Sequence, residues 1–338
     1  MKATLLKPAS TLVASALVTS CAANSQMVTQ KTDPIRVDGS STVAPITQLA
    51  ADEFKASHSK QTEVSINTSG TGGGFKKFCS GETDINNASR PILIQEMDAC
   101  KQTKVAYLEI PIAFDAITVV VNPQNTWAKD MTSAELRKLW EPDAEEKITN
   151  WRQIRSSYPD RPIALYAPGQ NSGTFDYFTQ IVNGSGGASR KDYSASKEAN
   201  DLAQNVIRDP NAIAYFGFGY YQADAKQLKP LAINSGQGAV LPSVKTVQSA
   251  KYQPLSRPLF IYVNLNSAQK KPQVKAFVEA YLKNADRHVK QTGYIPLPSQ
   301  GYQLALNHFH EGKVGTVFAG KLQPGITITQ LLAKEAVF

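Results

Sequence analysis

Short β-rich runs alternate with amphipathic helical segments along the chain after residue 34. The stretch "IRVDGSST" (35–42) is typical of a strand that ends in a polar turn, and the apolar residues that follow it keep one helical face. The stretches "TEVSINTSGTGGG" (62–74) and "RPIALYAPGQNSGTFDYF" (161–178) repeat this order of strand, turn and helix. Strands that alternate with helices in this way predict an α/β fold.

Several other segments also have recognisable patterns. A capping box of Thr132 and Glu135 predicts the start of a helix. Further strands are expected at 116–122, 211–221 and 256–264, and a further helix at 272–285. At 338 residues the chain is long enough for two lobes of roughly 150 residues each. Its composition, 42% hydrophobic and 19% charged, is that of a soluble globular protein, and no apolar run reaches the length of a transmembrane helix.

The first 34 residues have the layout of an export signal followed by a tether. Lys2 and Lys7 precede a modest apolar run, and small residues then lead to Cys21. The sequence "VTSC" resembles a bacterial lipobox, so we expect residues 1–20 to be a signal peptide and Cys21 to be lipidated. Residues 21–34 would then form a lipid-anchored tether. The alternative is an ordinary cleaved signal peptide with an incidental cysteine; both predict a location in the periplasm or at the cell surface.

The remaining two cysteines are Cys79 and Cys100. An exported protein folds in an oxidising compartment, and using Cys21 for a lipid leaves an even pair. Two isolated cysteines do not have the spacing of a metal site. We therefore expect a disulfide bond between them.

The net charge is +8, and removal of Lys2 and Lys7 leaves 34 basic against 28 acidic residues, or +6. The basic residues are scattered and do not alternate with aromatic residues in one stripe, so nucleic-acid binding is not expected. A mild positive field is compatible with an anionic ligand.

Three turns between a strand and a helix share the chemistry of an anion site. They are "DGSST" (38–42), "TSGTGGG" (68–74) and "NSGT" (171–174). Each offers hydroxyl groups and free backbone amides at a helix N-terminus, where the helix dipole favours negative charge. The candidate residues are Ser40, Ser41, Thr42, Gly70, Thr71, Ser172, Gly173 and Thr174. One such turn is usually an ordinary helix cap, but three at the carboxyl ends of strands favour a ligand site.

The segment "DINNASRPI" (84–92) adds Ser89 and Arg90 after a short strand. An arginine at this place can form bidentate hydrogen bonds with a tetrahedral oxyanion. Taken alone, Arg90 is better explained as a surface arginine that pairs with a carboxylate.

Four segments together resemble a known family. "VDGSSTVAPI" (37–46), "TSGTGGGFKKFCSGETDINNASRPI" (68–92), "NSGTFDYF" (171–178) and "SRPLFIYVN" (256–264) are similar to motifs of the extracytoplasmic phosphate-binding proteins of bacterial ABC uptake systems. The resemblance is to the PstS type, in particular its SphX-like subgroup, and it covers nearly the whole mature chain.

The resemblance implies a two-lobe fold of the periplasmic binding protein type II class, with crossing strands and phosphate in a cleft between the lobes. Lobe 1 would comprise 35–115 and 258–338, and lobe 2 would comprise 116–257. The implied function is capture of inorganic phosphate for an ABC importer, with the permease subunits as partners and a monomer as the expected state. The motif positions imply that the candidate residues named above contact the phosphate.

Two positions depart from the pattern of the family. Ser89 stands where many members have an aspartate that accepts the phosphate proton, and Pro168 stands where many have an arginine. Arg90 is then the obvious replacement charge. Asp176, four residues after Ser172 on the same helical face, is our candidate for the proton acceptor, with Asp38 as the alternative.

Other functions are weighed against this prediction. The chain has no G-x-S-x-G segment, no Walker loop and no histidine near a nucleophile motif, so an enzyme is not expected. His308 and His310 at a helix end are better explained as solvated residues than as metal ligands, and we expect neither a metal nor a cofactor. A site for sulfate, molybdate or a phosphonate remains open, as does a phosphate-sensing or adhesive surface protein.

Overall fold

The computed structural model describes residues 1–4, 33–57, 62–170, 172–196 and 198–320. Cys21 and the predicted tether up to residue 32 lie outside the described residues. The fold reported below belongs to the compact unit Thr32–Phe338. No helix among the described residues is long and apolar enough to span a membrane.

The predicted α/β fold is confirmed, and a large mixed sheet organises it. In the described residues the sheet has ten strands in the order β2-β1-β3-β12-β4-β8-β6-β7, with β13 and β9 also paired to β4. The strands are β1 (Ile35–Gly39), β2 (Val64–Ile66), β3 (Ile85–Ala88), β4 (Tyr107–Val121), β6 (Ala164–Pro168), β7 (Ser194–Ser196), β8 (Ala212–Gly217), β9 (Lys229–Pro230), β12 (Ser256–Asn264) and β13 (Ile295–Pro296). A separate small sheet contains β5 (Asp130–Thr132), β10 (Ala232–Asn234) and β11 (Ala239–Val240).

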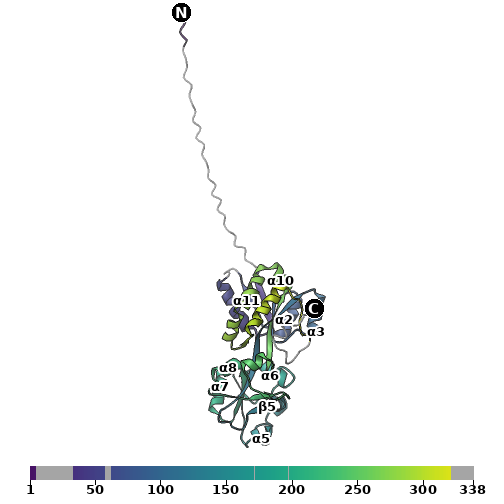
Figure 1. Ribbon diagram of the computed structural model, residues 1–338, viewed down its shortest axis with the longest axis vertical. Helices are drawn as coiled ribbons and strands as arrows, with labels where there is room; N and C mark the ends of the chain where they lie inside the picture. Colours follow the sequence, from purple (N-terminus) through teal and green to yellow (C-terminus); the bar gives the residue numbers. More distant parts are fainter. Residues whose placement is uncertain (5–32, 58–61, 171, 197, 321–338) are drawn as a thin grey trace. The chain divides into compact units, whose positions relative to one another are not determined.

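The long strand β4 connects the two lobes. Its residues up to Ala116 pair antiparallel with β12, and its residues from Ile117 onward pair with β8. Figure 1 shows long strands running from the lobe that carries α2, α3 and α11 to the lobe that carries α6, α7 and α8. The change of partner lies one residue from the boundary predicted after residue 115. We therefore keep 35–115 plus 258–338 as the proposed lobe 1 and 116–257 as the proposed lobe 2.

Helices cover both parts of the sheet. In lobe 1 they are α1 (Ala44–Ser57), α2 (Gly70–Cys79), α3 (Ile94–Gln102), α10 (Leu265–Lys270), α11 (Pro272–Gln291) and α12 (Ser299–Glu311). In lobe 2 they are α4 (Ser133–Trp140), α5 (Trp151–Ile154), α6 (Gly173–Val182), α7 (Ala199–Arg208), α8 (Phe218–Ala223) and α9 (Val244–Gln248), with a 3₁₀ turn at Pro142–Ala144. The capping box at the start of α4 is confirmed, since Thr132 Oγ1 accepts from the Glu135 amide at 3.1 Å.

Two predicted elements differ from the structure. The strand expected over 211–221 ends at Gly217 and continues as α8. Phe218 and Tyr221 lie one helical turn apart, and both pack against the largest hydrophobic cluster, which a strand with alternating faces would not allow. The glycine-rich turn predicted over 68–74 is also shorter, because α2 already begins at Gly70.

The predicted disulfide bond is confirmed. Cys79 at the end of α2 is bonded to Cys100 in α3, with a separation of 21 residues. Both cysteines belong to the hydrophobic cluster that contains Phe75 and Phe78 of α2. The bridge therefore fixes the helix whose N-terminus carries the candidate residues Gly70 and Thr71.

A half-buried glutamate supports the loop that carries Arg90. Glu109 of β4 accepts hydrogen bonds from Tyr262 Oη at 2.5 Å and from Thr316 Oγ1 at 2.6 Å. Burial raises the pKa of the Glu109 carboxyl to about 7, although hydrogen bonds from Thr316 and Tyr262 oppose this shift. Tyr262 Oη in turn accepts from the Ile92 amide at 2.9 Å, so this network holds the backbone two residues after Arg90.

Candidate functional site

The turn between β1 and α1 supplies Ser40, Ser41 and Thr42. Ser40 Oγ accepts from the Thr42 amide at 3.2 Å, and the Ser40 amide donates to the Asn87 carbonyl of β3 at 2.8 Å. These bonds set the turn against the end of the sheet and leave Ser41 exposed. Thr42 Oγ1 accepts from Arg257 Nη2 at 3.3 Å, so the first candidate turn contacts an arginine.

The N-terminus of α2 has no side chain that caps it. Ser69, which precedes the helix, donates its hydroxyl to Asp38 Oδ1 at 2.7 Å. Thr71 Oγ1 lies 3.2 Å from Ser89 Oγ and accepts from the Ser89 amide at 3.1 Å. The first-turn amides of an α-helix have no partner within the helix, so this end of α2 remains suited to an anion.

Asp38 is engaged by neighbours in lobe 1. Besides Ser69, it forms an ion pair with Lys77 at 2.5 Å and accepts from the Gly39 amide at 2.7 Å. Burial would raise the pKa of Asp38, but the hydrogen bonds from Lys77 and Ser69 outweigh it and the pKa is lowered. Asp38 is therefore a poorly available acceptor for a proton from a ligand.

Arg90 forms a bidentate ion pair with Glu96 of α3. Arg90 Nη1 donates to Glu96 Oε2 at 2.8 Å, and Arg90 Nη2 donates to Glu96 Oε1 at 2.7 Å. Arg90 Nη1 also donates to the Pro91 carbonyl at 3.0 Å, and the guanidinium lies 5.8 Å from the Phe75 ring centre. The arginine lines a cavity, but a carboxylate of its own lobe already compensates its charge.

The N-terminus of α6 in lobe 2 contacts the turn between β1 and α1 in lobe 1. Ser172 Oγ accepts from the Thr174 amide at 3.2 Å and so caps α6. A Cβ atom on Gly173 would lie 2.4 Å from Thr42 Oγ1, which is closer than real Cβ contacts. A residue without a side chain is therefore needed at Gly173 for lobe 2 to approach lobe 1 this closely.

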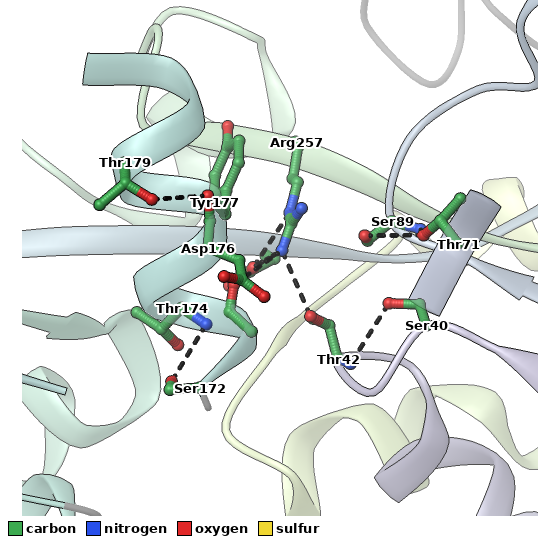
Figure 2. A network of polar contacts seen from close by, with 12 residues as sticks. Ser40, Thr42, Thr71, Ser89, Ser172, Thr174, Asp176, Tyr177, Thr179 and Arg257 are labelled. Atoms are coloured by element: carbon green, nitrogen blue, oxygen red, sulfur yellow. Dashed lines mark hydrogen bonds and ion pairs between the residues drawn. The ribbon is translucent and has the colours of Figure 1, made fainter. Parts of the chain in front are cut away.

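Arg257 lies at this junction and is absent from the predicted candidates. It stands at the start of β12, and its guanidinium donates to Asp115 Oδ2 of β4 at 3.0 and 3.2 Å. Its Nη2 also lies 3.5 Å from the Gly173 carbonyl, and the guanidinium sits 3.9 Å from the centre of the Tyr177 ring. Figure 2 shows Arg257 between Asp176 and Tyr177 of α6 on one side and Thr42 on the other. The signal in the sequence is that Arg257 is a charged residue in the otherwise largely apolar strand segment "SRPLFIYVN".

Asp115 is the buried counterion of Arg257. Its exposed fraction is 1%, and burial raises its pKa, although the charge and hydrogen bonds of Arg257 act in the opposite direction. The pair fixes the guanidinium at the point where β4 passes from one lobe to the other.

Asp176 projects from the first turn of α6 and is exposed. Loss of hydration raises the pKa of its carboxyl, and the nearby charge of Arg257 lowers it to a smaller extent. Its carboxylate accepts no hydrogen bond from any residue that the structure describes. Asp176, unlike Asp38, is therefore free to interact with a ligand.

Most of the candidate residues border two cavities, each lined by residues of both lobes. A cavity of about 540 Å³ is lined by Thr71, Ser89, Arg90, Asp176 and Arg257 together with apolar side chains. A second cavity of about 440 Å³ is lined by Ser41, Thr42, Ser172, Gly173 and Thr174, among others. Ser40 and Gly70 line neither of the two. The structure thus gathers the predicted turns at one junction of the lobes, but divides their side chains between two spaces.

The described residues contain no group of three or more His, Cys, Asp or Glu side chains placed to hold a metal ion. His310, one of the two histidines considered above, pairs with Glu279 at 3.0 Å on the surface.

Comparisons with known proteins identify a family and several similar proteins. A profile of the PBP superfamily domain matches residues 24–283. Protein SphX of a Synechocystis species is 50% identical over 309 residues, which are 91% of this chain and 92% of SphX. The phosphate-binding protein PstS of Staphylococcus saprophyticus is 34% identical over 271 residues, covering 79% and 82% of the two chains. The crystal structure of a possible phosphate-binding protein from Planctomyces limnophilus is 41% identical with a TM-score of 0.78, covering 83% of this chain and 98% of the other.

Proposed function

Because the chain belongs to the PBP superfamily, among the relatives of SphX and PstS, we propose that it captures inorganic phosphate outside the cytoplasm for an ABC importer. It is a solute-binding protein of a phosphate transport family and not an enzyme. The observation that carries the proposal is the position of Arg257. Its guanidinium lies within hydrogen-bond distance of Thr42 in lobe 1 and of the Gly173 carbonyl in lobe 2.

The proposed site combines one fixed positive charge with donors from both lobes. The uncapped amides of α2 and the hydroxyls of Thr71 and Ser89 come from lobe 1, and Ser172 and Thr174 come from lobe 2. Phosphate accepts hydrogen bonds at every oxygen, so one phosphate can be held by both sets once closure of the cleft brings the two spaces together. A ligand that contacts both lobes stabilises the closed arrangement of the cleft, because only that arrangement allows all contacts.

Arg257 replaces Arg90 as the principal cation in this proposal. Both arginines pair with a carboxylate. Glu96 and the Pro91 carbonyl engage both Nη atoms of Arg90, whereas Asp115 accepts only from Nε and Nη2 of Arg257. Nη1 of Arg257 has no hydrogen-bond partner among the described residues and is available to an anion. Arg90 is retained as a cavity-lining residue. Ser40, Ser41, Thr42 and Gly70 are retained as parts of the two turns that approach the anion.

Hydroxyl and amide donors do not distinguish phosphate from sulfate, so selectivity needs an acceptor. Near neutral pH phosphate carries a proton that it can donate to a carboxylate, whereas sulfate has none and would be repelled. Asp176 is the free carboxylate beside Arg257, which supports it over Asp38 as this acceptor.

Replacement of Asp176 by Asn should therefore relax the rejection of sulfate. We expect sulfate affinity to rise in Asp176→Asn, while phosphate affinity falls because its proton loses an acceptor. The raised pKa of Asp176 also predicts that the parent protein accepts sulfate better at the acid end of the range from pH 8 to pH 5, because a larger fraction of the carboxyl is protonated there than at an ordinary pKa and no longer repels the anion. Competition titrations with both anions across this range measure the two effects.

The matched control is Asp98→Asn, which removes an exposed carboxylate of α3 outside both cavities. If Asp176→Asn still rejects sulfate as strongly as the parent protein, Asp176 is not the discriminating group.

The proposal includes an anchored, monomeric protein that delivers phosphate to permease subunits. The sequence "VTSC" supports lipidation of Cys21, and mass spectrometry of the mature N-terminus decides between a lipid and a free residue. Transport itself is tested in the native host by deletion of the gene and measurement of labelled phosphate uptake at low phosphate concentration. Uptake should fall and be restored by the intact chain. Equal uptake with and without the protein would contradict the importer role.

A further inference from the structure

The larger cavity, which Arg257 lines, combines a few polar side chains with a mainly apolar lining. Its polar side chains include Thr71, Ser89, Arg90, Asp176 and Arg257. The rest is lined largely by apolar groups from both lobes, including Leu93, Phe114, Ile181, Val247, Pro254 and Phe318. This division is not required by a ligand that consists only of a tetrahedral anion.

The volume of the cavity is also larger than a single tetrahedral anion requires. Its volume is about 540 Å³, whereas one water molecule takes roughly 30 Å³ in the liquid. Inorganic phosphate has five heavy atoms, so it fills only a small part of this volume. Cavities of roughly 300–1,000 Å³ with an apolar lining and a few polar groups are typical of sites for organic molecules.

The apolar wall is also held in place. Tyr177 lies under the Arg257 guanidinium, and its hydroxyl donates to the Pro254 carbonyl at 2.8 Å. This bond joins α6 to the segment before β12. Ile181, one helical turn after Tyr177, extends the wall along α6, and Leu93 extends it from lobe 1.

We infer that this cavity binds a phosphoryl group that carries one apolar substituent, as in an aryl or alkyl phosphate monoester or phosphonate. The inference rests on the proposed function for the position of the phosphoryl group beside Arg257. Such a ligand keeps three oxygens for the donors of the anion site, and its substituent occupies the space between Leu93 and Ile181. Removing these apolar walls from water favours binding, since inorganic phosphate leaves them hydrated.

The test is calorimetric titration of the mature protein with phenylphosphonate, glycerol 2-phosphate and inorganic phosphate. Phenylphosphonate cannot be hydrolysed at an ester bond, and glycerol 2-phosphate has a polar substituent. We expect phenylphosphonate to bind within about tenfold of phosphate, to compete with it, and to bind at least about tenfold more tightly than glycerol 2-phosphate. Binding of phosphate without measurable binding of phenylphosphonate would overturn the inference.

A variant that fills the apolar part locates the substituent. Ile181→Trp should weaken phenylphosphonate at least about tenfold and leave phosphate within about twofold. Leu304→Trp makes the same type of change on α12 at a residue that lines neither cavity and should alter neither affinity. Because phosphate binding itself reports a folded protein, equal weakening of both ligands by Ile181→Trp would contradict this placement. Ile181→Ser is a second variant, which should weaken phenylphosphonate selectively by removing the wall.

The outcomes separate this inference from the proposed function. Binding of phenylphosphonate without binding of phosphate would contradict phosphate capture but support the organic ligand. Binding of neither compound would contradict both.

Discussion

Replacement of Arg257 by Gln should weaken phosphate binding at least thirtyfold. Removal of one partner from a buried charged contact costs about 2–5 kcal/mol, and about 2 kcal/mol corresponds to thirtyfold. The variant also leaves the buried carboxylate of Asp115 without its counterion, next to the place where the anion binds. Titration of parent and variant with phosphate at one pH and one ionic strength measures the loss.

Two further variants separate the causes of this loss. Arg208→Gln removes an exposed arginine of α7 that lines neither cavity, so it controls for net charge. The double variant Arg257→Gln, Asp115→Asn removes both partners and therefore the repulsion from a stranded carboxylate. If Arg257 contacts the anion, the double variant remains weak. Arg90→Gln should cost less than Arg257→Gln, because Glu96 already engages both Nη atoms of Arg90. An unchanged dissociation constant in Arg257→Gln would show that another cation binds the phosphate.

Reduction of the Cys79–Cys100 bond should lower the free energy of unfolding by about 3 kcal/mol. The estimate follows from the entropy that a crosslink of this loop length removes from the unfolded chain. The bond joins the end of α2 to α3, so its loss should also loosen the helix whose N-terminus belongs to the proposed site. Denaturant titrations with and without reductant measure the change in stability.

The double variant Cys79→Ala, Cys100→Ala is the control for the reductant. Its stability should equal that of the reduced parent and should not respond to reductant. Thiol titration of the unfolded, unreduced protein checks the bond directly. Reactive thiols at both Cys79 and Cys100 under these conditions would contradict it.

The predicted turns lie at helix N-termini because their chemistry is local. The capping box of Thr132 and Glu135 and the cap of α6 by Ser172 involve residues within a few positions of one another. The α/β fold follows in the same way from the alternation of apolar runs. Sequence patterns of this kind are sufficient for such elements.

The role of Arg257 could not be predicted in this way, because it depends on partners far apart in the sequence. Its counterion Asp115 is 142 residues away, and its contact with Thr42 spans 215 residues. The choice between Asp38 and Asp176 as the proton acceptor could not be made from the sequence for the same reason. Lys77 and Ser69, which engage Asp38, approach it only when α2 packs beside β1.

Calorimetric titration of the mature protein with phosphate, sulfate and molybdate at neutral pH tests the central proposal most directly. We predict saturable binding of one phosphate per chain, with sulfate and molybdate at least about tenfold weaker because neither donates a proton to Asp176. No binding of phosphate, or tighter binding of sulfate or molybdate, would contradict the account.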